Sequence, residues 1–477
     1  MIGLKNSRIQ KVYHLDITTS DQKPLWIVPE IMESYQQRPF QFEQMRITES
    51  GCSDTIEAVW RSGDSDPWSV KLLNKVGRCG IALTKWSKTN FGSVRTELKK
   101  KRKLLQQAER RAIQGGNTMW MRTMEREINE LMDKEAKMWA QRGHVSWLKD
   151  GDRNTNFFHT KASQRRRRYY INGLYDNNNR WFTHKQGIID TVVDFYQSLF
   201  TSANPDSFDE VLDEIPHLVT SNMNAQLTDT FTTAEVEAAL KEMALLKAPG
   251  PNGMPLLFYQ SYWSLVGSDV IEAILNYLNT DSLPQSLCHS FITLIPKVKN
   301  PEHISQYRPI CLSNVLFRVF SKVLANRLKS IFPGLISKHK SAFLTDRLIL
   351  DNIMVAFETL HYMQNHSSGK TRYMALKLDT SKAYNRVEWA FMEKLMIKMG
   401  FNERWVQLMM VCITSATYSI LINGEAQGHI TPTTGLRQGN PLSPYLFLLC
   451  TKGLHGLIKK ATAMGGYSGR LNLLKWP

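Results

Sequence analysis

The stretch that decides the fold is YMALKLDTSKAYNRVEW, residues 373–389, in which an apolar strand pattern runs into a helical one. The pattern predicts a buried strand that ends at Asp379, with apolar residues on both of its faces. A carboxylate at the end of a buried strand is costly unless a cation occupies it. Local rules allow Asp379 equally well to cap a helix that starts near Ser381, so this stretch alone leaves a cation site and a helix cap both open.

On both sides of this stretch, β-rich runs alternate with amphipathic helices. The runs FITLIPKV at 291–298 and YSILING at 418–424 predict strands, and residues 313–331 and 389–399 predict helices. Alternation of this kind is typical of a mixed α/β unit. The sequence therefore predicts an α/β (α+β) fold class, with a helical, basic N-terminal arm ahead of the mixed unit.

The positive charge of the chain is concentrated upstream of the mixed unit. Residues 95–170 hold 20 Lys and Arg against 9 Asp and Glu, which accounts for most of the net charge of +17. Apolar residues at helical spacing through 121–138, and a Gly-Gly-Asn break at 115–117, predict a helical hairpin here. A surplus of this size favours a polyanionic partner, and nucleic acid is the first candidate; a solvated structural arm is the alternative.

A run of four arginines follows the predicted hairpin. Arg165, Arg166, Arg167 and Arg168 precede two tyrosines, so phosphate-pairing guanidinium groups stand beside rings that can stack on bases. The run is a candidate nucleic-acid-binding segment, and such a run is also typical of a nuclear-import signal. The following residues, 169–183, alternate around Asp-Asn-Asn-Asn and predict a strand, a turn and a second strand.

Composition limits the class of protein. The 477 residues suggest roughly three folding units, and an apolar share of 42% excludes a wholly disordered or fibrous chain. The six cysteines are scattered singly, which favours a reducing compartment without disulfides or a zinc module. No signal peptide or membrane-spanning segment is recognisable, so we expect an intracellular protein, nuclear or cytoplasmic, with no membrane partner.

Five segments, one of them within the stretch quoted first, occur in a fixed order. They are LKAPGPNGMP at 246–255, ITLIPKVKNP at 292–301, QYRPICLSNVLFRVFSKVLANRL at 306–328, KLDTSKAYNRVEW at 377–389 and INGEAQGHITPTTGLRQGNPLSPYLF at 422–447. Together they closely resemble the reverse transcriptases of plant non-LTR (LINE-type) retrotransposons. Upstream, RPFQFEQM, VSWLKDGDRNTNFFH and RRRRYYINGL resemble the region that joins endonuclease to polymerase in these elements, and VYHLDITTSDQKPLWI at 12–27 resembles the final strand of the endonuclease.

The resemblance implies an RNA-directed DNA polymerase that works on an RNA template, a DNA primer and deoxynucleotides. It implies that Asp379 holds catalytic Mg²⁺, since two hard cations need carboxylate oxygens. Tyr384 would lie under the incoming sugar and exclude a 2′-hydroxyl. Triphosphate oxygens would be neutralised from a fingers hairpin, and the nucleotide and template would pack against a glycine loop; the residues implied are Lys297 and Arg308 for the first role and Gln438 and Gly439 for the second.

The resemblance also implies a division of the chain, with remnant endonuclease strands at 1–35, a basic helical linker at 36–165, a β-hairpin and helical connection at 166–235, and polymerase fingers and palm at 236–477. The sequence departs from the family pattern in several places. Asn252, Asn385 and Asn440 stand where Asp is usual, Gln22 stands where the endonuclease has His, and no Ala-Asp-Asp occurs. We therefore expect a right-hand polymerase that stops before that motif, with an incomplete metal site and no detectable DNA synthesis; the alternative is a non-catalytic nucleic-acid-binding protein that uses the basic arm.

Overall fold

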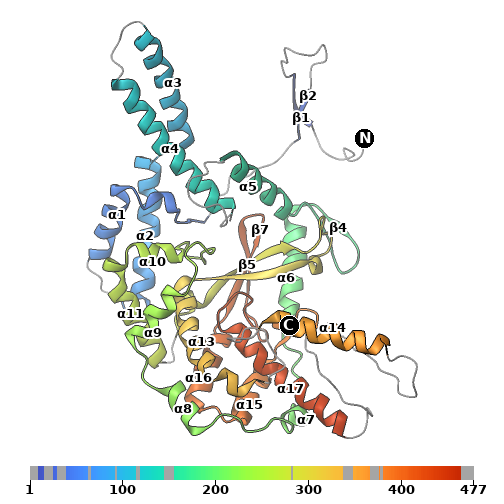
Figure 1. Ribbon diagram of the computed structural model, residues 1–477. Coiled ribbons are helices and arrows are strands. Elements are labelled where there is room, and N and C mark those ends of the chain that lie inside the picture. The colour runs from blue at the N-terminus through green and yellow to red at the C-terminus, as the bar shows by residue number, and fades with distance from the viewer. Residues whose placement is uncertain are drawn as a thin grey trace. The chain divides into compact units, whose positions relative to one another are not determined.

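The computed structural model describes residues 9–14, 25–29, 39–62, 66–91, 94–113, 119–143, 155–280, 283–336, 348–365, 375 and 380–463. The chain forms two compact units, Met1–Arg38 and Pro39–Pro477 (Figure 1). The first unit contains two antiparallel strands, β1 (Ile9–His14) and β2 (Leu25–Pro29), in which Tyr13 lies opposite Trp26. These strands fall within the stretch for which the sequence predicts the end of an endonuclease.

The second unit is mixed helix and sheet, as the sequence predicts, and helices make up most of it. Its N-terminal part contains η1 (Gln44–Arg46), α1 (Ser50–Arg61), α2 (Trp68–Trp86), the π-helix η2 (Ser87–Phe91), α3 (Val94–Ile113), α4 (Met119–Gly143) and α5 (Thr155–Tyr169). The middle part contains α6 (Lys185–Leu199), α7 (Asp209–Leu212), α8 (Ser221–Thr228), α9 (Thr233–Lys241), α10 (Leu256–Ser261), α11 (Trp263–Thr280) and α12 (Gln285–Cys288). The C-terminal part contains η3 (Ile304–Gln306), α13 (Val315–Leu335), α14 (Ile349–Asn365), η4 (Ala383–Arg386), α15 (Trp389–Met399), α16 (Glu403–Thr414) and α17 (Ser443–Ala463).

Four strands form the main sheet in the order β6-β5-β7-β8. Their bounds are β5 (His289–Pro296), β6 (Tyr307–Ser313), β7 (Thr417–Ile422) and β8 (Glu425–Ile430). Neighbours pair antiparallel except β5 and β7, which are parallel, so Ile292 lies opposite Cys311 on one side and Ile420 on the other. The predicted strand-turn-strand at 169–183 is confirmed as the separate hairpin of β3 (Leu174–Tyr175) and β4 (Trp181–Phe182).

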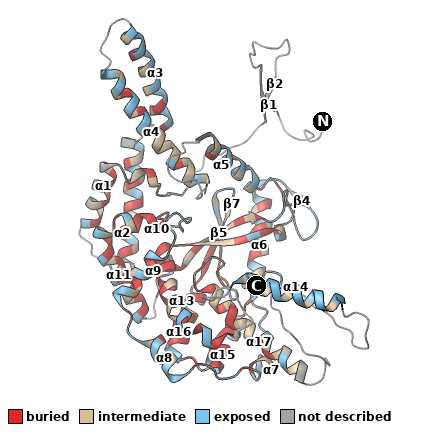
Figure 2. Ribbon diagram, viewed as in Figure 1, coloured by how far each residue is buried: buried red, intermediate tan, exposed pale blue. Residues whose placement is uncertain are grey.

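Two apolar clusters stabilise this unit. The larger is built around α13, an amphipathic helix most of whose residues are buried (Figure 2). Helices α11, α15, α16 and α17 contribute to the same cluster. The smaller cluster joins the sheet to α6 through side chains such as Tyr196, Ile292 and Ile420. The sheet therefore has a helical cover of its own, distinct from the α13 cluster.

The predicted helical hairpin is confirmed by α3 and α4, which lie side by side (Figure 1). The Gly-Gly-Asn break lies outside the described residues. Six residues of the hairpin are buried, and two of them, Val94 and Met138, pack with Met45 of η1. Ion pairs join α4 to its surroundings, Lys101 to Glu127 at 2.5 Å and Arg95 to Glu135 at 3.0 Å from α3.

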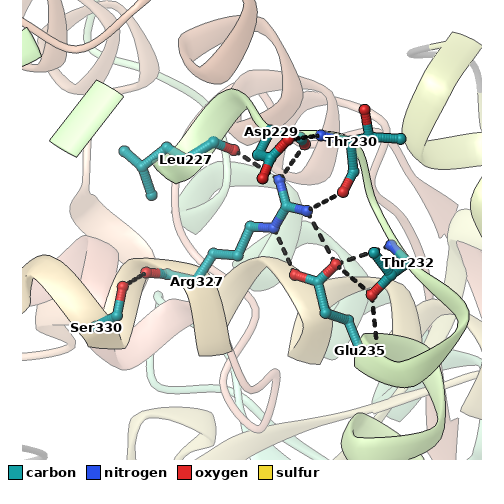
Figure 3. Close-up of polar contacts among 7 residues, drawn as sticks. All are labelled: Leu227, Asp229, Thr230, Thr232, Glu235, Arg327 and Ser330. Carbon is teal, nitrogen blue, oxygen red and sulfur yellow. Dashed lines mark hydrogen bonds and ion pairs between the residues drawn. The ribbon is translucent and has the colours of Figure 1, made fainter. Parts of the chain in front are cut away.

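One arginine of α13 fastens the chain segment between α8 and α9. Arg327 donates to both carboxylate oxygens of Glu235, at 2.6 and 2.9 Å, and to the backbone carbonyls of Leu227, Asp229 and Thr230 (Figure 3). Its guanidinium also lies 3.7 Å from the centre of the Phe231 ring. Glu235 is in turn the third residue of a capping box with Thr232. The ANRL part of the third family-like segment therefore has a structural role.

The GPNG loop is held by close backbone approaches. Gly253 has φ +72°, and a Cβ there would lie 1.9 Å from the carbonyl oxygen of Phe40, so only glycine fits. Its own carbonyl accepts a hydrogen bond from Phe42 N at 3.0 Å. Asn314, which precedes α13, accepts from Asn252 N and donates to the carbonyls of Ser286 and Leu287. The RPFQFEQM, GPNG and LSN segments are thus packed together.

Among the described residues, no helix combines the length and the apolar character needed to cross a bilayer. All six cysteines lie in the described part of the chain and are free thiols.

Candidate functional site

Backbone hydrogen bonds bring the KAYNRVEW segment against the TGLRQGN loop. Leu436 N donates to the carbonyl oxygen of Tyr384 at 2.7 Å, and Gly435 N donates to that of Val387 at 2.9 Å. Trp389 Nε1 returns a hydrogen bond to the carbonyl of Gly435 at 2.8 Å. Gly435 has φ +94°, and a Cβ there would lie 2.9 Å from a backbone oxygen of the facing segment. Two segments about fifty residues apart in sequence therefore form one ladder.

The same loop is fastened to the sheet at β6. Cys311 N donates to the carbonyl oxygen of Gln438 at 2.9 Å. Gly439 has φ +110°, and a Cβ on it would lie 3.2 Å from the carbonyl oxygen of Cys311, which is tighter than ordinary packing. The glycine is therefore required for a close approach to β6. The Gln438 side chain is partly exposed and Gly439 is exposed, so both remain available to a ligand.

Lys297 and Arg308 lie on the hairpin formed by β5 and β6. Arg308 pairs across the strands with Ile295, and Lys297 follows the end of β5. The hairpin loop is closed by Lys297, whose backbone N donates to the carbonyl of Gln306 at 2.9 Å and whose Nζ donates to that of Ser305 at 3.2 Å. Both side chains are exposed. The hairpin thus presents two cations on the strand pair that also carries the Gln438 contact.

Tyr384 lies in η4 and contacts α17. Its ring stacks on Phe447, with centroids 4.7 Å apart and planes 16° apart. Burial raises the pKa of its hydroxyl, so the group stays protonated at neutral pH. The stack holds the ring in a fixed orientation.

Lys382 is a residue that the sequence analysis did not single out. Its backbone is left-handed, with φ 54°, which is rare for a lysine. Its Nζ lies 3.9 Å from the centre of the Phe195 ring of α6. Burial, together with the charges of Lys297 and Arg386, lowers the pKa of Lys382 to about 8. Its position three residues after Asp379 was the only sequence signal, because neither the backbone angle nor the Phe195 contact is local.

Lys297 and Arg386 therefore both lie within electrostatic reach of Lys382. None of them forms an ion pair with any acidic side chain that the structure describes. Mutual repulsion among three cations is relieved by a bound anion. The arrangement is suited to a ligand with several negative charges.

The asparagines that depart from the family pattern occupy different environments. Asn440 is fully hydrogen-bonded, donating to Ser321 Oγ at 3.0 Å and accepting from Leu442 N at 2.8 Å. Asn252 accepts from Met254 N at 3.1 Å, and its Nδ2 is buried. Asn385 is buried at 4% exposure, directly after Tyr384. The amides at 252 and 440 thus serve local structure.

Arg165, Arg166, Arg167 and Arg168 lie in the last turns of α5, which contacts β5. The last three are exposed, and the Arg165 guanidinium lies 5.2 Å from the centre of the Tyr169 ring. The chain leaving α5 is fastened to the β7–β8 turn, because Asn423 accepts from Ile171 N at 2.8 Å and donates to its carbonyl at 3.0 Å. The arginine run is therefore tied to the same sheet as the hairpin cations.

Asp379 lies outside the described residues, as does the rest of the predicted strand except Ala375. Its distance from Gln438 therefore stays a prediction. In the described ranges, no three His, Cys, Asp or Glu side chains are grouped as metal ligands.

Known proteins with similar sequences indicate the ancestry of the chain. Residues 295–471 match the family model described as reverse transcriptase (RNA-dependent DNA polymerase). The chain is 24% identical over 429 residues to the transposon TX1 uncharacterized 149 kDa protein of Xenopus laevis, which covers 88% of this chain and 32% of that protein. It is also 24% identical over 259 residues to the retrovirus-related Pol polyprotein from type-2 retrotransposable element R2DM of Drosophila melanogaster, covering 54% of this chain and 23% of that protein.

One further match is shorter but has a higher sequence identity. An uncharacterized mitochondrial protein of Arabidopsis thaliana is 57% identical over 49 residues, which is 10% of this chain and 40% of that protein. The chain spans about a third or less of the length of the two transposon relatives. Together the matches give the chain its ancestry, which is reverse transcriptase of the non-LTR retrotransposon type.

Proposed function

From this reverse transcriptase ancestry, we propose that the second unit carries the fingers and palm of an RNA-directed DNA polymerase. Its substrates would be an RNA template, a DNA primer and deoxynucleotides. The observation that carries the proposal is the pair of backbone hydrogen bonds that join Leu436 to Tyr384 and Cys311 to Gln438. They bring together three of the family-like segments, which are far apart in sequence. The division of the chain into four regions, with boundaries after residues 35, 165 and 235, is part of the same proposal.

Each residue of the proposed site has a physical task. Lys297 and Arg308 neutralise triphosphate oxygens from the hairpin, and Arg308 is able to do so with two parallel hydrogen bonds. Lys382 and Arg386 add charge on the opposite segment, which explains why cations gather there. Tyr384, fixed by its stack on Phe447, excludes a 2′-hydroxyl by its ring. Gln438 and Gly439 support the nucleotide and the template.

The metal part of the proposal rests on the motif. Asp379 is proposed as a ligand of Mg²⁺, a hard cation that takes carboxylate oxygen and would polarise a phosphoryl oxygen when bound. The described residues do not form a magnesium site by themselves, since no carboxylate cluster occurs among them. We therefore assign no step to the metal. The cations described above act on the phosphates directly.

Deoxynucleotide binding by the full chain tests the proposed site. Replacement of Lys297 and Arg308 by Gln should weaken the affinity for a deoxynucleoside triphosphate by about tenfold or more, because each removes a charge-assisted contact. Arg404→Gln on α16 is the control, an exposed cation on another helix. Equal affinities for the wild-type protein and the double variant would overturn the assignment of the hairpin.

Sugar discrimination tests Tyr384 separately. Tyr384→Ala should raise the affinity for ribonucleotides relative to deoxynucleotides, whereas Tyr384→Phe should keep the wild-type ratio because the ring is retained. An unchanged ratio in the alanine variant would remove the steric role.

A second proposal concerns α5, since its exposed arginines stand beside Tyr169 and Tyr170. We propose that Arg165–Arg168 bind single-stranded nucleic acid, with the rings stacking on bases. Their replacement by Ala should flatten the slope of log K against log salt for single-stranded RNA by up to about three to four. An unchanged slope would leave the run as a solvated surface or an import signal.

A further inference from the structure

The basic charge upstream of the sheet is unevenly divided between the two helices of the hairpin. Helix α3 carries eight basic and two acidic side chains, whereas α4 carries five of each. On α4, Lys134 pairs with Glu49 and Arg142 with Glu43, at 2.5 and 2.6 Å. The net positive charge of the hairpin therefore belongs to α3, a distinction that the sequence analysis did not make.

Part of the α3 charge is used internally. Arg95, Lys100 and Lys101 form ion pairs with Glu135, Glu97 and Glu127. The remaining cations include Lys99, Arg102, Lys103 and Arg110, which are all exposed and form no ion pair with any acidic group in the described ranges.

These four side chains share one face of α3. At about 100° per residue they fall within an arc of about 100°, with the exposed Gln106 among them and Glu109 at its edge. The buried residues Val94, Leu98 and Ala108 lie on a different face. We call Lys99, Arg102, Lys103 and Arg110 the α3 basic stripe; from first to last it spans about 16 Å along the helix axis.

The corresponding face of α4 has a mixed charge. Arg122, Arg126 and Lys137 fall on one side of that helix at the same spacing, but Glu130 and Asp133 lie between them. Fields from interspersed opposite charges cancel over a short distance in salt. Both helices present exposed cations, but the electrostatic field of the α3 face is positive and that of the α4 face is largely cancelled.

From this geometry we infer that the α3 basic stripe binds the phosphate backbone of a nucleic-acid duplex without reading its sequence. A rigid row of about 16 Å matches about five base-pair steps at 3.4 Å each. Helix α3 contains no aromatic side chain, so it has nothing to stack on unpaired bases. Helix α5, with its tyrosines, is the contrasting surface. The inference stands apart from the proposed nucleotide site, since none of its residues is shared.

The test compares two triple variants of the full chain that remove the same charge. One carries Lys99→Gln, Arg102→Gln and Lys103→Gln; the matched control carries Arg122→Gln, Arg126→Gln and Lys137→Gln. Binding of an RNA–DNA hybrid, a DNA duplex and single-stranded RNA is measured from low to moderate salt. Circular dichroism checks that both variants keep their helices.

The stripe variant should lose about two to three units of the salt slope on a duplex, and the control less than one. Both duplexes should respond, with a preference for one of them identifying which is bound more tightly. Equal losses in the two variants, or a loss confined to single-stranded RNA, would overturn the inference. Deoxynucleotide affinity should be unchanged in both variants, so failure here and failure of the nucleotide site are distinguishable.

Discussion

Two arginines of α13 have opposite surroundings. Arg327, which is partly exposed and lies in the C-terminal half of the helix, meets a carboxylate and three carbonyls, and every nitrogen of its guanidinium has an acceptor (Figure 3). Arg318, near the N-terminal end, is 8% exposed, donates to the carbonyl of Ala248 at 3.3 Å, and its buried Nε has no partner. No acidic side chain in the described ranges pairs with Arg318.

The difference lies in the residues that face each arginine. Burial lowers the pKa of Arg318, so the charge is held there at a cost. Asn252 lies within hydrogen-bonding reach of the Tyr259 hydroxyl, and the charge of Arg318 acts on the same hydroxyl. The family-like pattern has Asp at 252, where this chain has a neutral amide. A carboxylate at position 252 would offer Arg318 a negatively charged acceptor, as Glu235 does for Arg327.

The largest effect on stability is expected from removing Arg327, whose hydrogen bonds are all made. Arg327→Ala should lower the free energy of unfolding by about 3 kcal/mol, because it leaves Glu235 and three carbonyls without their donor. Arg327→Lys should recover part of the loss, since one ammonium cannot serve all acceptors at once. Urea unfolding at neutral pH measures both. A loss below about 0.5 kcal/mol for the alanine variant would show that water replaces the guanidinium fully.

A gain in stability is expected from giving Arg318 a charged acceptor. Asn252→Asp should raise the free energy of unfolding by about 1–2 kcal/mol, because a carboxylate would accept from buried Arg318 and Tyr259. Asn402→Asp is the control and should change it little, since Asn402 is exposed and Asp keeps the acceptor that caps α16. Destabilisation by Asn252→Asp would mean that the added charge costs more than its pairing returns.

A smaller effect is expected when the unpaired charge is removed instead. Arg318→Met should change the free energy of unfolding by less than about 1 kcal/mol, since an apolar side chain of similar length avoids the desolvation cost. In the Asn252→Asp background the same substitution should be clearly harmful. A double-mutant cycle by urea unfolding measures this coupling, and a coupling energy near zero would separate residues 252 and 318.

The smallest effect concerns acid stability at the Arg327 end. Burial opposes ionisation of Glu235, but hydrogen bonds from Arg327 and from Thr232 outweigh it and lower the carboxyl pKa. The contribution is therefore fully present above the unfolded pKa of about 4.3 and is lost as pH falls through the lower folded value. Glu235→Gln should lose less stability than the wild-type protein when acidified below about pH 4. Parallel pH profiles would exclude this carboxyl as the source.

Local sequence patterns are sufficient to predict the bounds of a helix where a residue of the same segment ends it. Helix α15 has the bounds that the sequence predicts, because Gly400, with φ +92°, ends it. Helix α13 runs four residues beyond the predicted end, since the buried Phe332 and Leu335 continue its apolar pattern past Ser330. Strands β5 and β7 were predicted, but their parallel pairing depends on segments over a hundred residues apart.

The site was predictable only in part for the same reason. Motifs indicated Lys297, Arg308, Tyr384, Gln438 and Gly439, yet the hydrogen bonds that join them are between backbones, which composition does not encode. Lys382 was missed because its cation contact is with Phe195, a residue of α6. Which cations of α3 stay outside ion pairs depends on which acids face which bases across the hairpin, and this register is a tertiary property.

The amide of Asn423 in the β7–β8 turn makes both hydrogen bonds that attach Ile171 to the sheet, where paired backbones usually make such bonds. Asn423 and Gly424 both have positive φ, as a type I′ turn requires, and Asn423 also receives and returns the backbone hydrogen bonds of Ile171. Asn-Gly pairs are prone to spontaneous deamidation as a protein ages. Replacement of Nδ2 by oxygen at this position would set an acceptor against the carbonyl of Ile171. The attachment of the α5 exit to the sheet therefore has a chemical lifetime as well as a thermodynamic stability.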